Sequence, residues 1–303
     1  MEALRDEPLW TPAVQRPRSL HEAWELKRTF GRDGVYVAGS TLLRTQWEAG
    51  TVSMPKSLID LRGIEDLADI DEDGGGLSIG ALADLSRCRR SAALGHMAPA
   101  VQEAVRCIAA PAVRNLATIG GNIASGYGDC LPALLVCDAE LAVFDGKFLS
   151  RRRVEEWLAD RWSGMHPQED ILTGIWLAPP AGPAGSRRIE IFRKVGRREA
   201  FTPSLVTVAI GCFIDSEGRL SGVKIAAGGG SGRPQRLDIA EAVLEGASIG
   251  KEQLASVFEA VVTQFETYGD PFATVEYKKK TAGNLIVAEL WKALEGSAGK
   301  GDH

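Results

Sequence analysis

Two loops of glycine and small polar residues constrain this 303-residue chain more than any other feature. The first consists of Ala38, Gly39, Ser40 and Thr41. The second consists of Ala117, Thr118, Ile119, Gly120, Gly121 and Asn122. Glycine lets a backbone approach a ligand closely, and concave groups of N–H donors hold anions such as a pyrophosphate without a lysine. Either loop alone is interpreted more simply as a tight turn. Because both loops precede helix starts, the pair is interpreted equally well as two tight turns or as one ligand-binding site.

The first loop has the pattern of a strand, a turn and a helix around it. Residues 35–38 form a short apolar run that predicts a buried strand, and helical spacing begins at Leu42. Upstream, Ser19 and Glu22 form a capping-box pattern that predicts a helix ending near Gly31.

The second loop lies between two predicted helices. Apolar spacing predicts a helix over residues 99–108, whereas residues 115–123 are too rich in glycine and small polar residues for regular structure. Asp129 is predicted to cap the next helix, which has Pro132 in its first turn. Its carboxylate would equally accept hydrogen bonds from ribityl or ribose hydroxyls, and the two roles are compatible.

A segment rich in proline and glycine, residues 178–186, is the predicted linker between two domains. Beyond it, apolar residues predict three antiparallel strands, in residues 189–193, 206–214 and 223–227. The rest is predicted to be helical, in residues 239–244, 251–265 and 277–294. The lysines at positions 278–280 are expected on the solvent-exposed face of the last helix.

Composition excludes several classes of protein. The chain is 45% hydrophobic and 25% charged, as expected of a globular protein. Its 35 basic and 40 acidic residues give a net charge of −5, so clustered neutralisation of phosphates, and with it general nucleic-acid binding, is not expected. The first residues lack the apolar region of a secretory signal, and no stretch reaches the roughly 18 apolar residues of a membrane span. A cytoplasmic protein is therefore predicted.

Metal and nucleotide motifs are missing from the sequence. The five cysteines are scattered without a Cys-x-x-Cys pair and the four histidines are far apart, so no metal site is predicted. Residues 228–232 do not satisfy the dinucleotide-binding glycine pattern, and residues 246–251 do not satisfy the P-loop pattern. No catalytic side chain is predicted.

The order and spacing of several motifs resemble the FAD-binding medium subunits of molybdenum hydroxylases, the family of xanthine dehydrogenase and carbon monoxide dehydrogenase flavoproteins. The motifs are residues 37–43, residues 114–123, and Asp129 with residues 138–141. The likeness continues through residues 170–172, 192–198 and 270–277, and it covers nearly the whole chain. The loop at residues 117–122 is its most specific part.

The resemblance implies an α+β fold in two domains. Residues 1–178 would form a two-lobed FAD-binding domain of the vanillyl-alcohol-oxidase (PCMH) type, split near residue 60. Residues 187–303 would form a smaller C-terminal domain of the CO-dehydrogenase flavoprotein type, with a three-stranded antiparallel sheet and helices. FAD would lie between the two lobes.

The resemblance also implies which residues contact FAD. The pyrophosphate and ribityl part would contact Tyr36, Val37, Ala38, Gly39, Ser40, Thr41, Leu42, Ala117, Thr118, Gly120, Gly121 and Asn122. Ile108 and Ala109 would lie by the isoalloxazine edge, Asp129 by polar hydroxyls, and Leu172 with Arg193 or Lys194 near the ring.

Three positions depart from the family pattern. Ser40 and Leu42 replace a glycine and an acid in the first loop, which removes one polar contact. The segment between Asn122 and Asp129 is shorter than usual and has Gly128 where serine is common.

The resulting hypothesis is an FAD-dependent oxidoreductase subunit of a heterotrimer. A molybdopterin-binding large subunit would oxidise the substrate, and a 2Fe-2S small subunit would pass electrons on. FAD in this chain would deliver them to NAD or another acceptor. One alternative is a stand-alone flavin oxidoreductase of the same fold, and another is a non-catalytic assembly or binding protein with a decayed flavin pocket.

Overall fold

A small parallel sheet begins the fold. The computed structural model describes residues 11–197, 203–230 and 232–298. The sheet has the order β1-β3-β2, with bounds β1 (Ala13–Gln15), β2 (Gly34–Val37) and β3 (Ser57–Asp60). Helix α1 (Leu20–Phe30) packs on it, and Ser19 caps this helix by accepting the Glu22 N–H at 3.1 Å, so the predicted helix is confirmed. Short 3-10 turns, η1 (Gly31–Asp33) and η2 (Leu61–Gly63), and helix α2 (Thr41–Glu48) complete this lobe.

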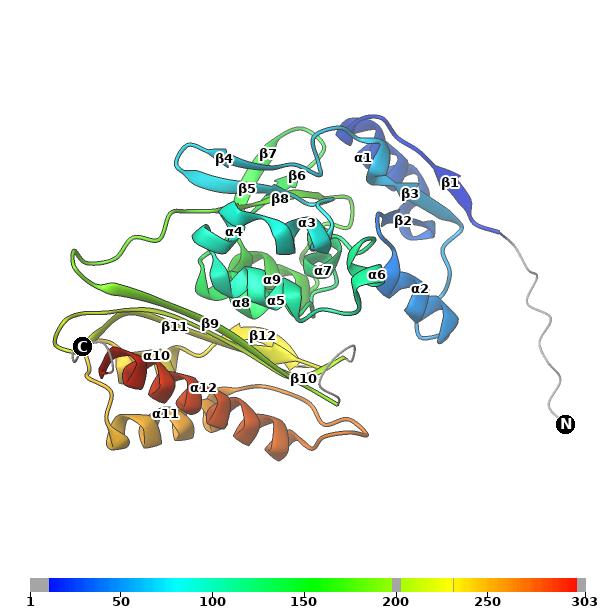
Figure 1. Ribbon diagram of the computed structural model, residues 1–303. Coiled ribbons are helices and arrows are strands. Elements are labelled where there is room, and N and C mark those ends of the chain that lie inside the picture. The colour runs from blue at the N-terminus through cyan, green and yellow to red at the C-terminus, as the bar shows by residue number, and fades with distance from the viewer. Residues whose placement is uncertain (1–10, 198–202, 231, 299–303) are drawn as a thin grey trace, which may run out of the picture.

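A five-stranded antiparallel sheet forms the second lobe, in the order β4-β5-β8-β6-β7. Its strands are β4 (Ile70–Asp73), β5 (Gly76–Gly80), β6 (Glu140–Phe144), β7 (Leu149–Arg153) and β8 (Ile171–Leu177). Figure 1 shows the helices of this lobe beneath the sheet. They are α3 (Leu85–Arg90), α4 (Ala92–Met97), α5 (Pro99–Arg106), α6 (Pro111–Arg114), α7 (Ile119–Ala124), α8 (Leu131–Val136) and α9 (Val154–Ser163).

The second glycine-rich loop is more regular than its sequence predicts. Residues 119–124 form the helix α7, so the prediction of irregular structure there is wrong. The helix forms because the Thr118 hydroxyl accepts the Gly121 N–H at 3.0 Å as an N-cap. Gly120 then packs so closely on Ala81 that a Cβ would lie 2.5 Å from its carbonyl oxygen.

The C-terminal part is a four-stranded antiparallel sheet with helices on one face. Its strands, in the order β12-β11-β10-β9, are β9 (Arg187–Gly196), β10 (Ser204–Ile214), β11 (Leu220–Gly229) and β12 (Gly232–Arg236). The helices are α10 (Asp238–Leu244), α11 (Lys251–Gln264) and α12 (Val275–Ala298). The three predicted strands are present, and β12 extends their sheet.

The last helix corrects one expectation. Lys278 is fully buried rather than solvated: its Nζ donates to the Tyr268 carbonyl at 2.8 Å and to Asp270 at 2.5 Å. Lys280 of the same run is exposed, as expected. The run therefore has one buried member, because the loop before α12 folds back over it.

Strand β10 explains why the two parts of the chain pack closely. It is buried on both faces, and large and small side chains alternate along it. Val206, Val208 and Ile210 pack on the C-terminal helices, while the opposite face carries small residues. Helix α8 packs on that small-residue face, and a Cβ added to Gly211 would lie 3.3 Å from the carbonyl oxygen of Val136. The close approach brings C-terminal strands up against the helices of the second lobe (Figure 1).

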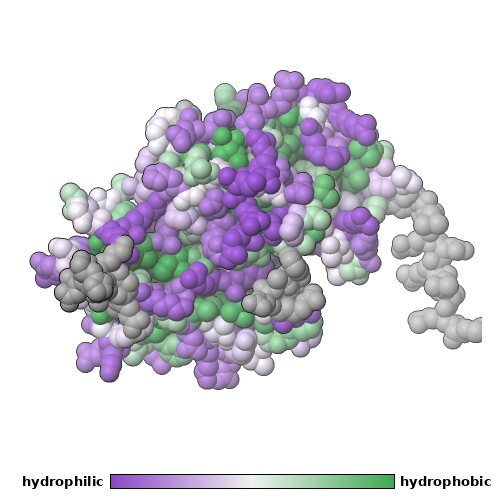
Figure 2. Space-filling model, in the orientation of Figure 1, coloured by the Kyte–Doolittle hydropathy of each residue, from purple (hydrophilic) through white to green (hydrophobic). Residues whose placement is uncertain are grey.

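The surface offers no membrane-spanning element in the part of the chain that is described. None of the helices within the described ranges is both long and apolar enough to cross a bilayer. Figure 2 shows hydrophilic residues over the middle of one face, with hydrophobic residues in scattered patches.

Candidate functional site

The two small-residue loops touch each other in the folded chain. A Cβ on Gly39 would overlap the carbonyl oxygen of Leu116 and lie 3.0 Å from Cα of Ala117. Glycine is therefore the residue that lets the first loop lie directly on the start of the second. In Figure 1 the helices next to these loops, α2 and α6, accordingly lie close together.

The first loop exposes backbone donors. Ser40, the N-cap of α2, has a left-handed φ of 54° and its side chain makes no capping hydrogen bond. The N–H groups of Thr41, Leu42 and Leu43, in the first turn of α2, donate to no acceptor among the described residues. Such donors at a helix start are suited to an anion. The Leu42 side chain is 49% exposed beside them.

The second loop, in contrast, uses its backbone donors internally. The N–H groups of Ile119 and Gly120 donate to the carbonyls of Ala83 and Ala81, at 3.0 and 2.9 Å. Those of Gly121 and Asn122 donate to the hydroxyl and the carbonyl of Thr118, both at 3.0 Å. Residues 119–122 are therefore a fixed wall rather than a source of free donors.

Gly121 leaves a space in that wall. Among the described residues, the only atom within 4 Å of a Cβ built on Gly121, outside its own helix backbone and neighbours, is the Thr118 hydroxyl oxygen at 3.0 Å. Packing within the protein therefore does not require glycine at this position. A ligand lying against the loop would require it.

Gly128 is explained by packing on Asn122. A Cβ on Gly128 would overlap Oδ1 and the carbonyl oxygen of Asn122, and Oδ1 also accepts the Cys130 N–H at 3.2 Å. A serine does not fit here. Gly128, at the end of the shortened segment, therefore packs directly against Asn122.

Asp129 joins the two parts of the chain. One carboxylate oxygen accepts from Lys194 Nζ at 2.7 Å and the other from the Ser204 hydroxyl at 2.6 Å. The Asp129 and Lys194 side chains are 14% and 10% exposed, so solvent screens this ion pair little. The predicted N-cap role is wrong: Cys130 occupies the N-cap of α8, and the helix start makes no side-chain cap bond. The carboxylate is drawn away from the helix by two polar groups of the C-terminal sheet.

Lys194 and Arg193 lie on opposite faces of β9, as neighbours in a strand do. Lys194 turns toward the second lobe, where its Nζ also donates to the Cys107 carbonyl at 3.1 Å. Arg193 instead pairs with Glu289 of α12 at 2.7 Å. The structure therefore brings Lys194, and not Arg193, to Asp129.

The remaining predicted residues lie on neighbouring elements. Tyr36, in β2, donates its hydroxyl to the Glu169 carbonyl at 2.8 Å, and burial raises the pKa of this phenol, with Glu169 adding to the effect. Val37 is buried at the end of the same strand.

The other predicted residues lie in the second lobe. Leu172 is half-buried in β8, paired with Val143 of β6. Ile108 and Ala109 form the turn after α5, and Ala109 has a left-handed φ of 45°.

Arg114 and Ser204 were not predicted as site residues. Arg114 is only 5% exposed, and its guanidinium binds the backbone carbonyls of Arg106, Ile108 and Ala109. Ser204 supplies the second partner of Asp129. The only sequence feature that pointed to Arg114 was its position at the start of the motif at residues 114–123. Its hydrogen-bond partners could not be predicted, because they are backbone carbonyls and residue type does not indicate which carbonyls a folded turn exposes.

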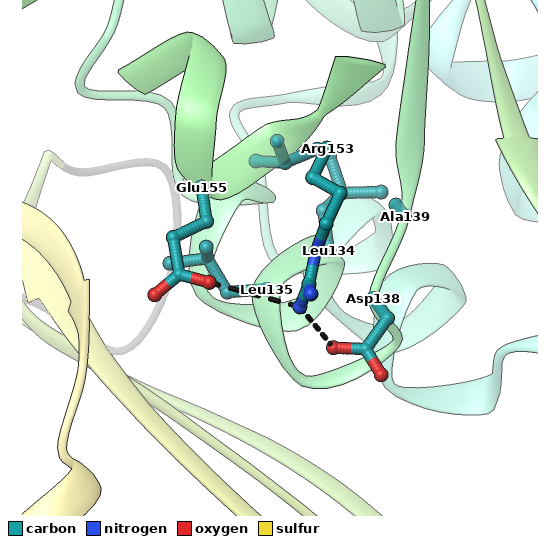
Figure 3. Close-up of a pocket in the computed structure, with 7 residues that line it drawn as sticks. Leu134, Leu135, Asp138, Ala139, Arg153 and Glu155 are labelled. Atoms are coloured by element: carbon teal, nitrogen blue, oxygen red, sulfur yellow. Dashed lines mark hydrogen bonds and ion pairs between the residues drawn. The ribbon is translucent and has the colours of Figure 1, made fainter. Parts of the chain in front are cut away.

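Two surface pockets lie elsewhere. Figure 3 shows one, in which Arg153 lies between Asp138 and Glu155, at 3.2 and 3.7 Å, beside Leu134 and Leu135. The other is a cavity of about 360 Å³ between α9 and β12, whose lining includes Trp162 and Arg233. None of the predicted site residues lines either pocket.

Comparison with known proteins gives matches over most of the chain. The family model described as the FAD binding domain in molybdopterin dehydrogenase matches residues 10–179. The model described as the CO dehydrogenase flavoprotein C-terminal domain matches residues 190–293.

Individual proteins match over similar lengths. The uncharacterized protein YgfM of Escherichia coli (strain K12) is 32% identical, over 91% of this chain and 93% of its own length. The nicotine 6-hydroxylase medium subunit of Paenarthrobacter nicotinovorans is 26% identical, over 91% of this chain and 95% of its own. A structure of reconstituted CO dehydrogenase from Oligotropha carboxidovorans superposes with a TM-score of 0.83 at 25% identity, over 94% of this chain and 98% of that one.

Proposed function

Because the chain belongs to the family of FAD-binding medium subunits of molybdenum hydroxylases, we propose that it is the electron-transfer subunit of such an enzyme. The predicted family, the α+β fold class and FAD as the cofactor are confirmed. At the level of the family, the chain is an oxidoreductase subunit. Its electron acceptor and its partners are part of the proposal.

The contact between the two loops is the observation that carries this function. It joins the loop in which the N–H groups of Thr41, Leu42 and Leu43 are free to the start of the loop in which Gly121 leaves space. These features suit the pyrophosphate of FAD, which needs donors on one side and close backbone approach on the other. We propose that residues 39–43 hold the pyrophosphate and that residues 117–122 shape the wall against it.

The chain's contribution is to bind and orient the flavin, and bound FAD supplies the redox chemistry. Asp129, Lys194 and Ser204 fix the C-terminal sheet against the second lobe. Lys194 reaches the Cys107 carbonyl, one residue before the turn at Ile108 and Ala109. We propose that Lys194, held by this network, and Leu172 of β8 lie near the isoalloxazine ring.

We assign the remaining redox centres to partner subunits: molybdopterin to a large subunit and 2Fe-2S clusters to a small one. The nicotine 6-hydroxylase and CO dehydrogenase relatives are themselves medium subunits or chains. In this chain, Cys88 and Cys212 are buried, and burial raises the pKa of each thiol to about 12. Electrons would pass from the small subunit to FAD and then to NAD or another acceptor. The cytoplasmic location and the domain boundary at residues 178–187 remain predictions.

FAD uptake by the full-length chain tests the proposal. The chain, purified with co-expressed partners, is expected to be yellow and to bleach with dithionite. Gly121→Val should lose flavin with only a modest fall in its thermal unfolding temperature, because the one atom of the described chain within 4 Å of the new Cβ is the Thr118 hydroxyl oxygen at 3.0 Å. A wild-type complex that takes up no FAD, or a Gly121→Val chain that binds it as tightly as wild type, would contradict the proposed site.

A further inference from the structure

Two cations hold four consecutive carbonyls of one turn. The turn follows α5 and comprises residues 106–109, at a helix end whose carbonyls have no intrahelical partners. Arg114 Nη1 lies 2.8 Å from the carbonyl oxygen of Ile108, 2.5 Å from that of Ala109 and 3.4 Å from that of Arg106. Lys194 Nζ donates to the carbonyl between them, that of Cys107, at 3.1 Å. Both cations also offset the negative end of the helix dipole.

Arg114 is unusual among buried arginines because no carboxylate of the described residues pairs with it. Its side chain makes no ion pair with a carboxylate in the described ranges, and its Nε is buried without a hydrogen-bond partner. A buried arginine is ordinarily paired. Burial lowers the pKa of Arg114, and the nearby Arg89 and Arg106 lower it further. The charge is therefore held in place by backbone dipoles alone.

The turn is strained where Arg114 binds it. Ala109 has a φ of 45°, and this left-handed conformation is strained for a residue with a Cβ. Strain of this kind persists where the surroundings impose it, and it concentrates at functional sites. The two hydrogen bonds from Arg114, to the carbonyls on either side of the Ala109 Cα, impose it here.

The direction of the free donors follows from peptide geometry. In a trans peptide the carbonyl and the following N–H point in opposite directions. The carbonyls of Ile108 and Ala109 both point to Arg114, so the N–H groups of Ala109 and Ala110 both point away from it. Neither N–H donates to an acceptor anywhere in the described chain. The turn thus presents two unused donors on the side opposite the guanidinium.

We propose that Arg114 is a positioning residue for the flavin ring. By fixing the two peptides, it aims the N–H groups of Ala109 and Ala110 at the acceptor atoms of the isoalloxazine pyrimidine ring. These donors stabilise the reduced flavin, which carries more negative charge there, and so raise its reduction potential. The inference rests on the proposed function, because it requires flavin beside residues 108–110.

The test compares full-length variants loaded with FAD. Arg114→Met should lower the affinity for reduced flavin about tenfold relative to oxidised flavin, which lowers the potential of a two-electron couple by about 30 mV. It should also change the visible absorption spectrum of the bound flavin. Arg114→Lys keeps the charge but not both carbonyl bonds, so we expect an intermediate shift.

The matched control is Arg89→Met. Arg89 is an exposed cation close enough to affect the Arg114 pKa, but it binds none of the turn's carbonyls. If the potential follows charge alone, Arg89→Met shifts it and Arg114→Lys does not, and the inference is overturned. An unchanged potential and spectrum in Arg114→Met would overturn it as well.

Folding is separated from positioning by a second variant. Ala109→Gly removes the strain, since glycine adopts the left-handed conformation freely. In the double variant with Arg114→Met, Ala109→Gly should restore the thermal stability but not the reduction potential of the flavin. Recovery of both would show that Arg114 has only a structural role. Failure of the wild-type chain to bind FAD would instead refute the proposed function itself, and the inference with it.

Discussion

The loops at residues 38–43 and 117–122 resemble each other in composition but differ in what their backbones do. In the first, the N–H groups of Thr41, Leu42 and Leu43 are free. In the second, the N–H groups of residues 119–122 are all bonded within the protein. One loop can donate to a ligand, and the other is a rigid wall whose glycines allow close packing.

The difference shows that glycines in loops of similar composition can be present for different physical reasons. Gly39 and Gly120 are required by protein packing, because a Cβ on either would meet a backbone oxygen of another segment. Gly121 is not required in this way. Substitution at these glycines therefore separates folding from flavin binding.

The largest effect is expected at Gly39. Gly39→Val should lower the free energy of unfolding by about 3 kcal/mol and abolish FAD retention, since the clash is with the backbone at Leu116 and not with a flexible side chain. Urea unfolding and FAD titration measure the two effects. Gly269→Val is the control, because a Cβ there would meet nothing nearer than 3.7 Å. Equal stability of the two variants would show that the loops do not depend on this contact.

The next effect distinguishes the two adjacent glycines of the second loop. Gly120→Ala should cost about 1–3 kcal/mol of stability, because its Cβ would lie 2.5 Å from the Ala81 carbonyl oxygen. Gly121→Ala should leave stability nearly unchanged and weaken FAD binding. Thermal unfolding without FAD, followed by FAD titration, measures both. The reverse order of sensitivities would show that the space beside Gly121 is not the flavin site.

A smaller effect is expected at the cap of α7. Thr118→Val removes the hydroxyl that accepts the Gly121 N–H, which should cost about 1 kcal/mol. Thr118→Ser keeps the hydroxyl and should retain most of the stability. Chemical denaturation compares the pair, and equal losses in both variants would mean that the cap bond contributes nothing.

The smallest effect is expected at Ser40, which has a left-handed φ of 54°. Ser40→Gly relieves left-handed strain of about 1 kcal/mol but loses a similar amount to the freedom of glycine in the unfolded chain. The unfolding temperature should therefore change little. Ser40→Val should be clearly destabilised, because a β-branched residue tolerates this conformation poorly. Equal unfolding temperatures for Ser40→Val and wild type would show that the loop readily adopts another conformation.

Much of the fold was predictable from local patterns. The Ser19 cap, the strand at residues 34–37 and the alternation along β10 all follow from nearest-neighbour chemistry. Two errors occurred where a tertiary partner competed with a local one. Asp129 binds Lys194 and Ser204 instead of capping α8, and Lys278 is buried against Asp270 instead of solvated.

The candidate site was predictable as a set of loops but not as a set of contacts. The motif at residues 117–122 predicts a ligand-binding loop, and the structure shows that the backbone donors of residues 119–122 are bonded within the protein. Lys194 and Arg193 were indistinguishable in sequence, and only the side of β9 on which each lies separates them. Arg114 has no sequence signal for its role, because its partners are carbonyls, which every residue has.

The sequence by itself determined the family, the cofactor and the two loops, because glycines, hydroxyl residues and their spacing record where a backbone must come close to another group. The tertiary structure decided which N–H groups are free, which cation faces Asp129 and what Arg114 holds. These depend on how segments distant in the chain are oriented when they meet. The sequence shows which donors and acceptors are present. Because hydrogen bonds are directional, only the tertiary packing determines which of them pair.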